Sequence, residues 1–458
     1  MGKSRLLRSD GNYIHDYAFV KDVSGAYLTL PRAFEGDQVD CAGSGRTEMP
    51  SPISCRSCGS DRLETILRLG QMPLANAYLT REQLDRPEPK YPLDLAFCHS
   101  CALLQITETV PPDVLFREYL YFSSYSDTVV QNAEEIVTRL IQSRNLNGNS
   151  LAGEIASNDG YLLQFYKRAG IPVLGIEPAA NVAKVAIHER GIRTLCDFFG
   201  ADLARKLRDQ GECVDVLHGN NVLAHVADLN SVVSGMRLLL KENGMAVIEV
   251  PYVKEMIDHC EFDTIYQEHL CYFSLTALDR LFHRHGLVIE DVEHLPIHGG
   301  SLRLFVVPCH RAGSRPRVEA ALAEESSWGV DKAGYYRSFS QRVDHLKASL
   351  LEVLKRLKGE GKRLAAYGAA AKGTVLLNYC GVGPEILEFV VDRSPHKQGR
   401  HMPGVRVLIQ APERLLEVTP DYVLLLVWNI ADEVLEQQSE YRRRGGKFII
   451  PIPEVRIV

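Results

Sequence analysis

Four of the eleven cysteines stand in two Cys-x-x-Cys pairs, Cys55 with Cys58 and Cys98 with Cys101. Each pair lies beside a short apolar run, residues 63–67 and 93–97, and such runs predict strands of a hairpin. Two knuckles of this kind can present four thiolates tetrahedrally, as a structural zinc site requires. Because such a site has no open coordination position, we expect the metal to stabilise a small module and not to act in catalysis. The alternative is two unrelated, reduced pairs.

A polar turn, residues 157–160, follows a predicted strand and precedes a predicted helix. Its residues tolerate unusual backbone angles and can cap that helix. The next strand, residues 172–177, ends at Glu177, and an acid at this place is typical of a nucleotide site in which it binds ribose hydroxyls. The Gly-x-Gly-x-x-Gly pattern of dinucleotide sites is absent, whereas Glu154 and Asp159 suit a cation. The turn therefore favours S-adenosylmethionine, which carries a sulfonium and an ammonium; an ordinary βαβ unit is the alternative.

Two histidines are candidates for acid–base chemistry. Glu268 and His269 are adjacent within Tyr-Gln-Glu-His, residues 266–269, and a close carboxylate can orient a histidine and raise its basicity. Methylation on carbon needs such a base because the carbon must first lose a proton, whereas a free oxygen or nitrogen often needs less. His225 is the second candidate. The alternative is that both are ordinary histidines of a loop or a helix end.

Further polar and aromatic residues follow other predicted strands, where ligands of parallel sheets bind. An acid and an aromatic ring, Asp197 and Phe198, could hold an adenine. A stretch dense in hydroxyls and aromatics, residues 119–126, could form the floor of a substrate pocket or pack between two domains. Ser301 and Arg303 could meet an anionic ligand, although Arg303 is equally well explained as an outward strand residue.

The elements that must position these residues alternate between strand and helix. Strands are expected at 151–156, 172–177, 192–196, 213–219 and 245–250, then at 288–293 and 302–307. Alternation at this spacing predicts a parallel, doubly wound α/β sheet with right-handed crossovers. Five parallel strands closed by an antiparallel pair are the arrangement of the class I methyltransferase sheet.

A second alternation follows a helical region at 317–359, which we expect to break near Gly329. Strands are expected at 362–367, 386–391, 422–427 and 447–450, and they predict a second, smaller Rossmann-like domain. Lys372, in the turn after the first of these strands, and Asp392, after the second, suit a nucleotide phosphate and ribose. A structural or dimerisation domain is the alternative.

Length and composition limit the remaining possibilities. With 458 residues, 45% of them apolar and 24% charged, the chain predicts a globular protein of several domains. Its net charge of −6 gives no general attraction to nucleic acid or to acidic membranes. We see no export signal and no membrane-spanning run, and expect a cytoplasmic monomer or homodimer. The expected boundaries are a poorly ordered extension (1–50), a zinc-binding domain (51–125), a methyltransferase domain (126–308) and a C-terminal Rossmann-like domain with a leading helix (309–458).

Together these pieces resemble the bacterial NDP-sugar C-methyltransferase family over residues 53–455. The order and spacing of the motifs carry the resemblance, not any one of them. The motifs are the two cysteine pairs and residues 73–76, 121–126, 154–160, 221–225, 266–269, 299–303 and 367–369. Ala156 stands where the family often has glycine, a departure that would tighten the cofactor turn.

The resemblance implies methyl transfer from S-adenosylmethionine to a ring carbon, typically C3, beside the C4 ketone of a nucleotide-linked deoxysugar. It implies that His269 is the base, that Glu268 orients it, and that Tyr121, Tyr266 and His225 line the sugar. The cofactor is expected at Glu154, Ala156, Asn158, Gly160, Tyr161, Glu177, Asp197, Phe198, Asn220 and Asn221, and the substrate at Tyr125, Ser301, Arg303, Lys372 and Asp392. The alternatives are an O- or N-methyltransferase acting on a small molecule, and an NAD-binding or scaffold protein.

Overall fold

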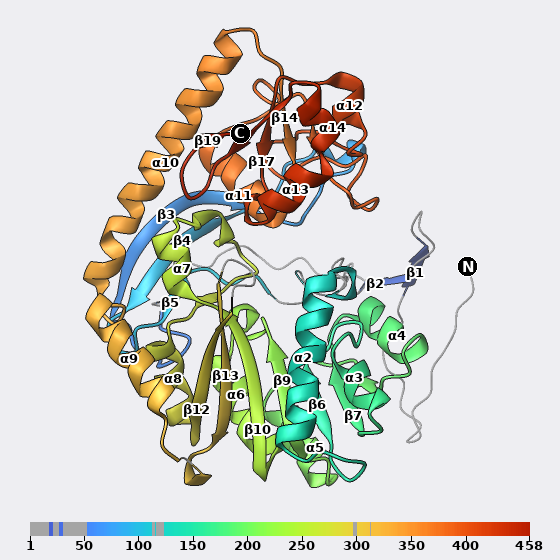
Figure 1. Ribbon diagram of the computed structural model, residues 1–458, viewed down its shortest axis with the longest axis vertical. Helices are drawn as coiled ribbons and strands as arrows, with labels where there is room; N and C mark the ends of the chain where they lie inside the picture. The colour runs from blue at the N-terminus through green and yellow to red at the C-terminus, as the bar shows by residue number, and fades with distance from the viewer. Residues whose placement is uncertain are drawn as a thin grey trace, which may run out of the picture. The chain divides into compact units, whose positions relative to one another are not determined.

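The computed structural model describes residues 18–21, 27–30, 53–111, 115, 123–295, 300–311 and 313–458 (Figure 1). The chain divides into two units, Met1–Ser51 and Pro52–Val458. In the first unit, β1 (Ala18–Lys21) pairs antiparallel with β2 (Tyr27–Leu30). The sequence does not predict this hairpin, and most of the extension expected over residues 1–50 lies outside the described residues.

The second unit begins with an antiparallel sheet that carries the cysteine pairs. Its strands, in the order β11-β5-β4-β3, are β3 (Leu63–Pro73), β4 (Lys90–Cys98), β5 (Leu104–Ile106) and β11 (Cys271–Tyr272). Two of the strands are predicted from the apolar runs beside the cysteines. The strand β11 is not predicted, because two residues give no periodicity. This strand belongs to the segment that follows Tyr266–His269, so the cysteine-bearing sheet and the catalytic candidates are held together by backbone hydrogen bonds.

The central sheet has seven strands in the order β12-β13-β10-β9-β6-β7-β8. They are β6 (Ala152–Ile155), β7 (Val173–Ile176), β8 (Thr194–Leu195), β9 (Val214–Asn220), β10 (Leu240–Pro251), β12 (Leu287–Leu295) and β13 (Ser301–Pro308). The first five are parallel, and β13 runs antiparallel between β10 and β12. This is the predicted class I methyltransferase order, and all seven strands lie within a few residues of their predicted places.

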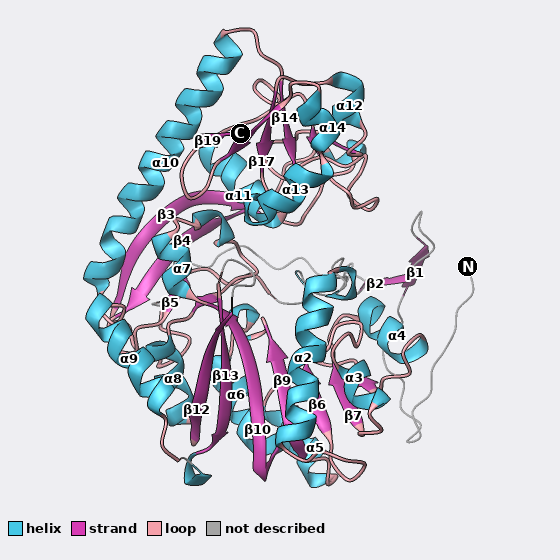
Figure 2. Ribbon diagram, in the orientation of Figure 1, coloured by secondary structure: helices cyan, strands magenta, loops and turns pink. Residues whose placement is uncertain are grey.

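Both faces of this sheet are covered by helices (Figure 2). Neighbouring residues of β10 belong to the hydrophobic cores on opposite faces of the sheet. Val247 lies in the core that contains Ile136 of α2, and Ile248 lies in the core that contains Met236 of α6. Alternation of this kind follows from the period of two residues along a strand. The helices are α2 (Asp127–Ser143), α3 (Leu163–Arg168), α4 (Ala180–His188), α5 (Ala201–Asp209), α6 (Leu229–Leu239), α7 (Val253–Asp258) and α8 (Leu275–Arg284).

The C-terminal sheet has six strands in the order β16-β15-β14-β17-β18-β19. They are β14 (Leu364–Tyr367), β15 (Val390–Val391), β16 (Ile409–Gln410), β17 (Tyr422–Leu425), β18 (Lys447–Ile450) and β19 (Arg456–Ile457), all parallel except β19. Its helices are α11 (Ala371–Cys380), α12 (Arg414–Val418), α13 (Ala431–Gln437) and α14 (Ser439–Arg443). The predicted Rossmann-like domain is therefore confirmed, with the two-residue strands β16 and β19 added.

Two helices connect the central and C-terminal sheets. They are α9 (Pro316–Trp328) and α10 (Ala333–Gly359), and the break between them falls at Gly329, as predicted. Gly329 has a φ of 76° and ends α9 in the left-handed conformation that glycine adopts without strain. α10 packs along the cysteine-bearing sheet, where the rings of Tyr336 and Phe97 lie 5.0 Å apart. Among the described helices, none has both the length and the apolar character needed to cross a lipid bilayer.

Candidate active site

The turn after β6 lies in the region of the backbone map that favours glycine. Ala156, Asn158 and Gly160 have φ values of 51°, 50° and 78°. The predicted unusual backbone angles are therefore confirmed, and Ala156 adopts an angle that costs a residue with a Cβ about 1 kcal/mol or more. The predicted capping is wrong: α3 begins only at Leu163, and its N-cap residue, Leu162, makes no side-chain hydrogen bond. The turn is joined to the helix by a backbone hydrogen bond instead, from the Gln164 N–H to the Gly160 carbonyl at 3.1 Å.

Two acids of this region are satisfied by the protein itself. The Asp159 carboxylate lies 3.0 Å from the Arg190 guanidinium. Both oxygens of Glu177 accept backbone N–H groups, from Asn158 at 2.9 Å and from Ala179 at 2.8 Å. The charge of Asp159, which the sequence analysis assigns to a cationic ligand, is therefore balanced internally. Glu177 fixes the turn against the start of α4, and its remaining lone pairs can still accept ribose hydroxyls.

Glu154 is the acid that fits a cationic ligand. Its side chain is buried at the end of β6, and Oε2 has no hydrogen-bond partner among the described residues. Burial, and then the nearby Asp159 and Glu177 carboxylates, raise its pKa well above the ordinary value, and a hydrogen bond from Tyr161 partly offsets this. A cation beside Glu154 would favour its ionised form, because an opposite charge lowers the pKa of a carboxyl group. The residues present therefore fit the sulfonium and ammonium of S-adenosylmethionine.

The neighbouring strand ends carry the other candidates for cofactor binding. Asn220, at the end of β9, donates a hydrogen bond from Nδ2 to the Tyr161 hydroxyl at 3.2 Å, and its buried Oδ1 has no partner among the described residues. Asn221 has a φ of 54°, which turns the chain away from the strand. Beyond β8, Asp197 is exposed, and Phe198 exposes 47% of its surface. An exposed aromatic ring at this edge fits the predicted contact with an adenine.

Ser123 and Ser124, in the described part of the hydroxyl-rich stretch before α2, contact the turn. The backbone N–H of Ser123 donates to Asn158 Oδ1 at 2.9 Å, and the Ser124 hydroxyl donates to Asp159. Tyr121 lies outside the described residues, as does the side chain of Tyr125. Their roles in lining the substrate therefore stay predictions.

His269 is held at both ring nitrogens. Nδ1 lies 2.9 Å from the carbonyl oxygen of Thr264, and Nε2 lies 2.8 Å from the Tyr266 hydroxyl. Since a carbonyl only accepts, Nδ1 carries the proton, and the lone pair of the neutral ring is on Nε2, where the Tyr266 hydroxyl donates to it. The His269 ring also packs against the Tyr266 ring, with centroids 4.0 Å apart, and lies 4.9 Å from the His225 ring. This geometry fixes Nε2 as the ring nitrogen that can act as a base.

Glu268 does not have the role that the sequence analysis gives it. Its carboxylate accepts a hydrogen bond from Asn76 Nδ2 at 2.7 Å, whereas both ring nitrogens of His269 face Thr264 and Tyr266. Burial raises the pKa of Glu268, and the hydrogen bond from Asn76 lowers it. Adjacent side chains of a loop point in different directions, so sequence adjacency does not bring the carboxylate to the imidazole. The group that orients His269 is a backbone carbonyl.

His225, in the 3₁₀ helix η3 (Leu223–His225), is partly buried, and its ring lies beside that of His269. Burial lowers its pKa to about 4, although a hydrogen bond with the backbone of Glu268 raises it slightly. His225 is therefore neutral at pH 7 and adds no positive charge next to the proposed base.

Arg303 is part of a buried ion pair, in contrast to its predicted contact with an anionic ligand. Nε donates to Glu249 Oε1 at 2.7 Å, Nη2 donates to Asn132 Oδ1 at 2.7 Å, and Nη1 lies 3.4 Å from Glu293. The side chain is 5% exposed. Since all three guanidinium nitrogens have protein partners, Arg303 joins α2 to the sheet. Ser301 is likewise buried, at the first position of β13.

Lys372 and Asp392 lie at the carboxyl ends of the C-terminal strands, as predicted. Asp392 accepts hydrogen bonds from the backbone N–H groups of Ala369 and Ser394 at 2.7 and 2.8 Å. Lys372 Nζ donates to Asn429 Oδ1 at 2.8 Å and lies 4.6 Å from the centre of the Trp428 ring. Lys372 therefore faces protein groups, and its binding of a phosphate stays a prediction.

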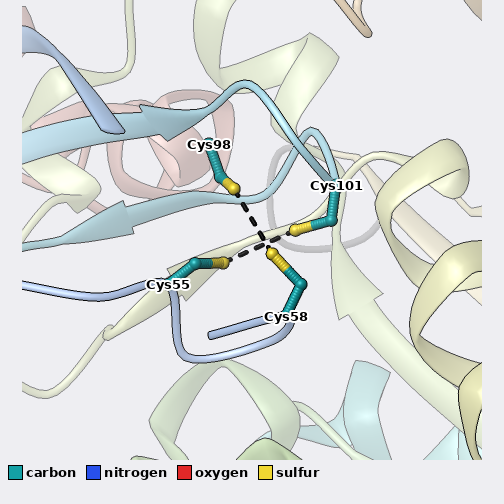
Figure 3. Close-up of side chains that lie close together, drawn as sticks. All are labelled: Cys55, Cys58, Cys98 and Cys101. Carbon is teal, nitrogen blue, oxygen red and sulfur yellow. Dashed lines mark hydrogen bonds between the residues drawn. The ribbon is translucent and has the colours of Figure 1, made fainter. Parts of the chain in front are cut away.

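The four cysteine side chains converge, as Figure 3 shows. Their Sγ atoms all lie within 4.8 Å of one another, with Cys55 and Cys101 3.5 Å apart and Cys58 and Cys98 3.6 Å apart. A tetrahedral zinc with Zn–S bonds of about 2.3 Å places its sulfurs about 3.8 Å apart, so four thiolates here fit the ion. The predicted ligand set is brought together, and this is the one such cluster of cysteine, histidine or acidic side chains among the described residues.

The residues that hold the site in place carry no signal in the sequence. Thr264 acts through its carbonyl, which every residue carries, and no residue type marks it. Arg190 balances Asp159 from 31 positions away, and Asn76 reaches Glu268 across 192 positions. Without the structure, a relation over such distances could have been found only from paired variation among relatives.

Three family models match successive parts of the chain. A zinc binding domain matches residues 55–116, a methyltransferase domain residues 130–292, and a C-methyltransferase C-terminal domain residues 296–453. The C-methyltransferase NovU of Streptomyces niveus is 36% identical over 407 residues, which are 88% of this chain and 96% of the relative. A ubiquinone biosynthesis O-methyltransferase of Bartonella bacilliformis is 32% identical over 96 residues, which are 21% of this chain and 38% of that relative.

Solved structures resemble only part of the chain. The magnesium protoporphyrin IX methyltransferase ChlM of Synechocystis PCC 6803, with bound SAM, is 14% identical with a TM-score of 0.30, over 39% of this chain and 79% of its own. The PH0226 protein of Pyrococcus horikoshii OT3 is 15% identical with a TM-score of 0.34, over 43% of this chain and 96% of its own.

Proposed function

The chain belongs to the C-methyltransferase family, and on that premise we propose that it methylates C3 of a nucleotide-linked 4-keto-deoxysugar. It is an S-adenosylmethionine-dependent methyltransferase with a zinc-binding module. The observation that carries the proposal is the state of His269, whose Nδ1–H is fixed by the Thr264 carbonyl so that Nε2 is the basic nitrogen. A carbon acceptor needs a base of this kind, because its C–H bond must be broken before the new bond forms.

The ketone at C4 makes the C3 proton acidic, and His269 Nε2 is the base that drives its removal through the Tyr266 hydroxyl. The C3–H bond breaks, and its electron pair passes into an enolate with the negative charge largely on the C4 oxygen. When bound, S-adenosylmethionine supplies a sulfonium methyl group, which C3 attacks while the S–CH₃ bond breaks and its electron pair stays on sulfur. Hydrogen bonds to the C4 oxygen would provide the largest electrostatic stabilisation.

Tyr266 controls access to the basic nitrogen. Its hydroxyl occupies the lone pair of His269 Nε2 at 2.8 Å, so a substrate carbon cannot reach that lone pair in the same geometry. We propose that Tyr266 acts as a relay: its oxygen receives the C3 proton while its own proton passes to Nε2. Replacing Tyr266 by phenylalanine should then lower the rate of proton removal. If the hydroxyl is instead displaced by the substrate, this variant keeps the rate of the unmodified enzyme.

The nucleotide part of the acceptor is proposed to lie at the ends of the C-terminal strands. Asp392 is 14% exposed there, and Lys397 lies 3.8 Å from its carboxylate. Lys397 also donates to the Ala369 carbonyl at 2.7 Å. Burial lowers the pKa of Lys397, and Asp392 raises it, so an anionic ligand beside this lysine would favour its charged form. These groups support a diphosphate and a ribose as the ligand.

Of the alternatives, the NAD-binding or scaffold protein is excluded by membership of a methyltransferase family. Methylation of an oxygen or nitrogen remains the competing chemistry for the acceptor. Incubation with methyl-labelled donor and a TDP-4-keto-deoxysugar separates the two, since the proposal requires the label on a ring carbon. A label on oxygen would refute it.

The role of His269 is tested by following exchange of the C3 proton with deuterium from solvent, which reports on the base alone. His269→Asn should abolish both exchange and transfer, a loss of at least about 100-fold, while donor affinity stays within twofold. His259→Asn is the matched control, because this half-exposed histidine, ten residues before His269, pairs with Glu255 at 3.3 Å. Equal exchange in His269→Asn and the control would refute the assignment.

A further inference from the structure

The carbonyl that orients His269 belongs to a short helix that is anchored to the C-terminal part of the chain. This helix is η4 (Phe262–Thr264). Asp263 is completely buried in it, and its Oδ2 accepts a hydrogen bond from Trp428 Nε1 at 2.8 Å. Trp428 opens the 3₁₀ helix η6 (Trp428–Ile430), just after β17 of the C-terminal sheet. The next residue is Thr264, so the anchoring residue is directly adjacent to the one whose carbonyl contacts His269.

The anchor is electrostatically well supported. Burial raises the pKa of Asp263 to about 6, while the Lys372 ammonium and the Trp428 hydrogen bond lower it, so the carboxylate is ionised at pH 8. A hydrogen bond to an ionised acceptor is stronger than one between neutral groups. Lys372 also lies over the Trp428 ring, 4.6 Å from its centre, and holds Asn429 of η6 at 2.8 Å. The indole is therefore fixed on two sides.

The path from the anchor to the base is short and stiff. The Thr264 hydroxyl donates to the Glu261 carbonyl at 2.7 Å, and the backbone N–H of Ile265 donates to the Phe262 carbonyl at 3.1 Å. The ring of Phe262 is completely buried and packs against Tyr379 of α11 at 5.3 Å between centroids. A displacement of Asp263 would therefore move the Thr264 carbonyl together with the rest of η4.

We propose that Asp263 is a positioning residue for the reaction: held by Trp428, it fixes the Thr264 carbonyl and through it the tautomer and direction of His269. The inference rests on the proposed function, since it takes His269 as the base. It assigns the C-terminal part of the chain a task beyond substrate binding, because the basic nitrogen is correctly presented only when Trp428 is docked on η4. The competing explanation is that the Asp263–Trp428 bond only joins two parts of the protein.

The test removes the hydrogen-bond donor of Trp428 while an aromatic ring stays at the same position. Trp428→Phe removes the indole N–H, and Asp263→Asn keeps an acceptor oxygen at the same place. Thr374→Val is the matched control, because it removes another hydrogen bond between distant parts of the chain, from the Thr374 hydroxyl to the Ala75 carbonyl at 2.9 Å, and neither residue belongs to η4. All three are compared with the unmodified protein at pH 8 for C3 deuterium exchange, methyl transfer and the KM of the acceptor.

We expect Trp428→Phe to lower the rate of exchange and kcat together by about 10- to 100-fold, because a small misplacement of the base is costly, with KM changed less than twofold. Asp263→Asn should retain more of the rate than Trp428→Phe. Nitrogen-15 spectra of labelled histidine should show His269 with its proton on Nδ1 in the unmodified protein and in Thr374→Val, and a mixture of tautomers in Trp428→Phe.

Two results would overturn the inference. One is a Trp428→Phe enzyme with the exchange rate of the unmodified protein, and the other is an equal loss of rate in Trp428→Phe and Thr374→Val. Failure of the proposed function is distinguishable, because the unmodified protein would then show no exchange at C3 and no methyl on carbon.

Discussion

Replacing Glu154, near the end of β6, by glutamine should weaken binding of S-adenosylmethionine more than the isosteric replacement of any neighbouring acid. Glu154 is 1% exposed, and one of its oxygens has no partner among the described residues. The neighbouring acids are already satisfied, Asp159 by Arg190 and Glu249 by Arg303. Glu154 is therefore the acid of this group with a free place for a cation.

The size of the effect follows from what the substitution removes. A hydrogen bond to a charged group contributes about 1.5 to 3 kcal/mol, and each 1.4 kcal/mol is tenfold in affinity. Glu154→Gln keeps the shape and loses the charge, so the dissociation constant should rise about 10- to 150-fold. Calorimetric titration at pH 8 measures it, with Glu212→Gln as control, because Glu212 pairs with Arg193 at 2.7 Å on the surface.

The pH dependence gives an independent check. The pKa of Glu154 is raised in the free protein, chiefly by burial, and a bound cation would lower it. Binding should therefore release protons, and affinity should rise with pH until the pH exceeds the raised pKa, then level off. Affinity that is constant or increases from pH 8 down to pH 5.5, or a Glu154→Gln dissociation constant within twofold of the unmodified protein, would refute the reasoning.

Three further changes test other parts of the structure. Cys58→Ser should lower bound zinc, measured by elemental analysis, from about one equivalent to near zero, whereas Cys196→Ser should not, because Cys196 is exposed and outside the cluster. Arg303→Met should destabilise the protein by about 3 to 5 kcal/mol in urea unfolding, since it leaves Glu249 buried without its partner; Arg68→Met, at an exposed pair, should change it by less than about 1 kcal/mol. Ala156→Gly should stabilise the protein by about 0.5 to 1 kcal/mol, seen as a higher Tm, because φ is 51° there; an unchanged or lower Tm would show that the turn is not strained.

Two residues of the site have partners other than those predicted from the sequence. Glu268 and His269 are neighbours in sequence, yet the carboxylate accepts from Asn76 while the imidazole faces Thr264. Arg303 follows two glycines and a serine, a pattern that indicates an anion site, but its side chain enters the sheet and pairs with Glu249. In both cases, the direction of a side chain depends on packing that no local pattern records.

The sequence by itself determined where strands and helices alternate in the central and C-terminal domains. It also determined the break at Gly329, the cysteine ligands and the turn with unusual backbone angles. These depend on periodicity and on the backbone freedom of single residues, which are local properties. Only the tertiary structure decided which polar groups meet, such as Asn76 with Glu268 and Trp428 with Asp263, which are 192 and 165 positions apart. The physical reason is that a buried polar group must find a partner wherever the fold brings one within about 3 Å, and chain distance does not restrict that choice.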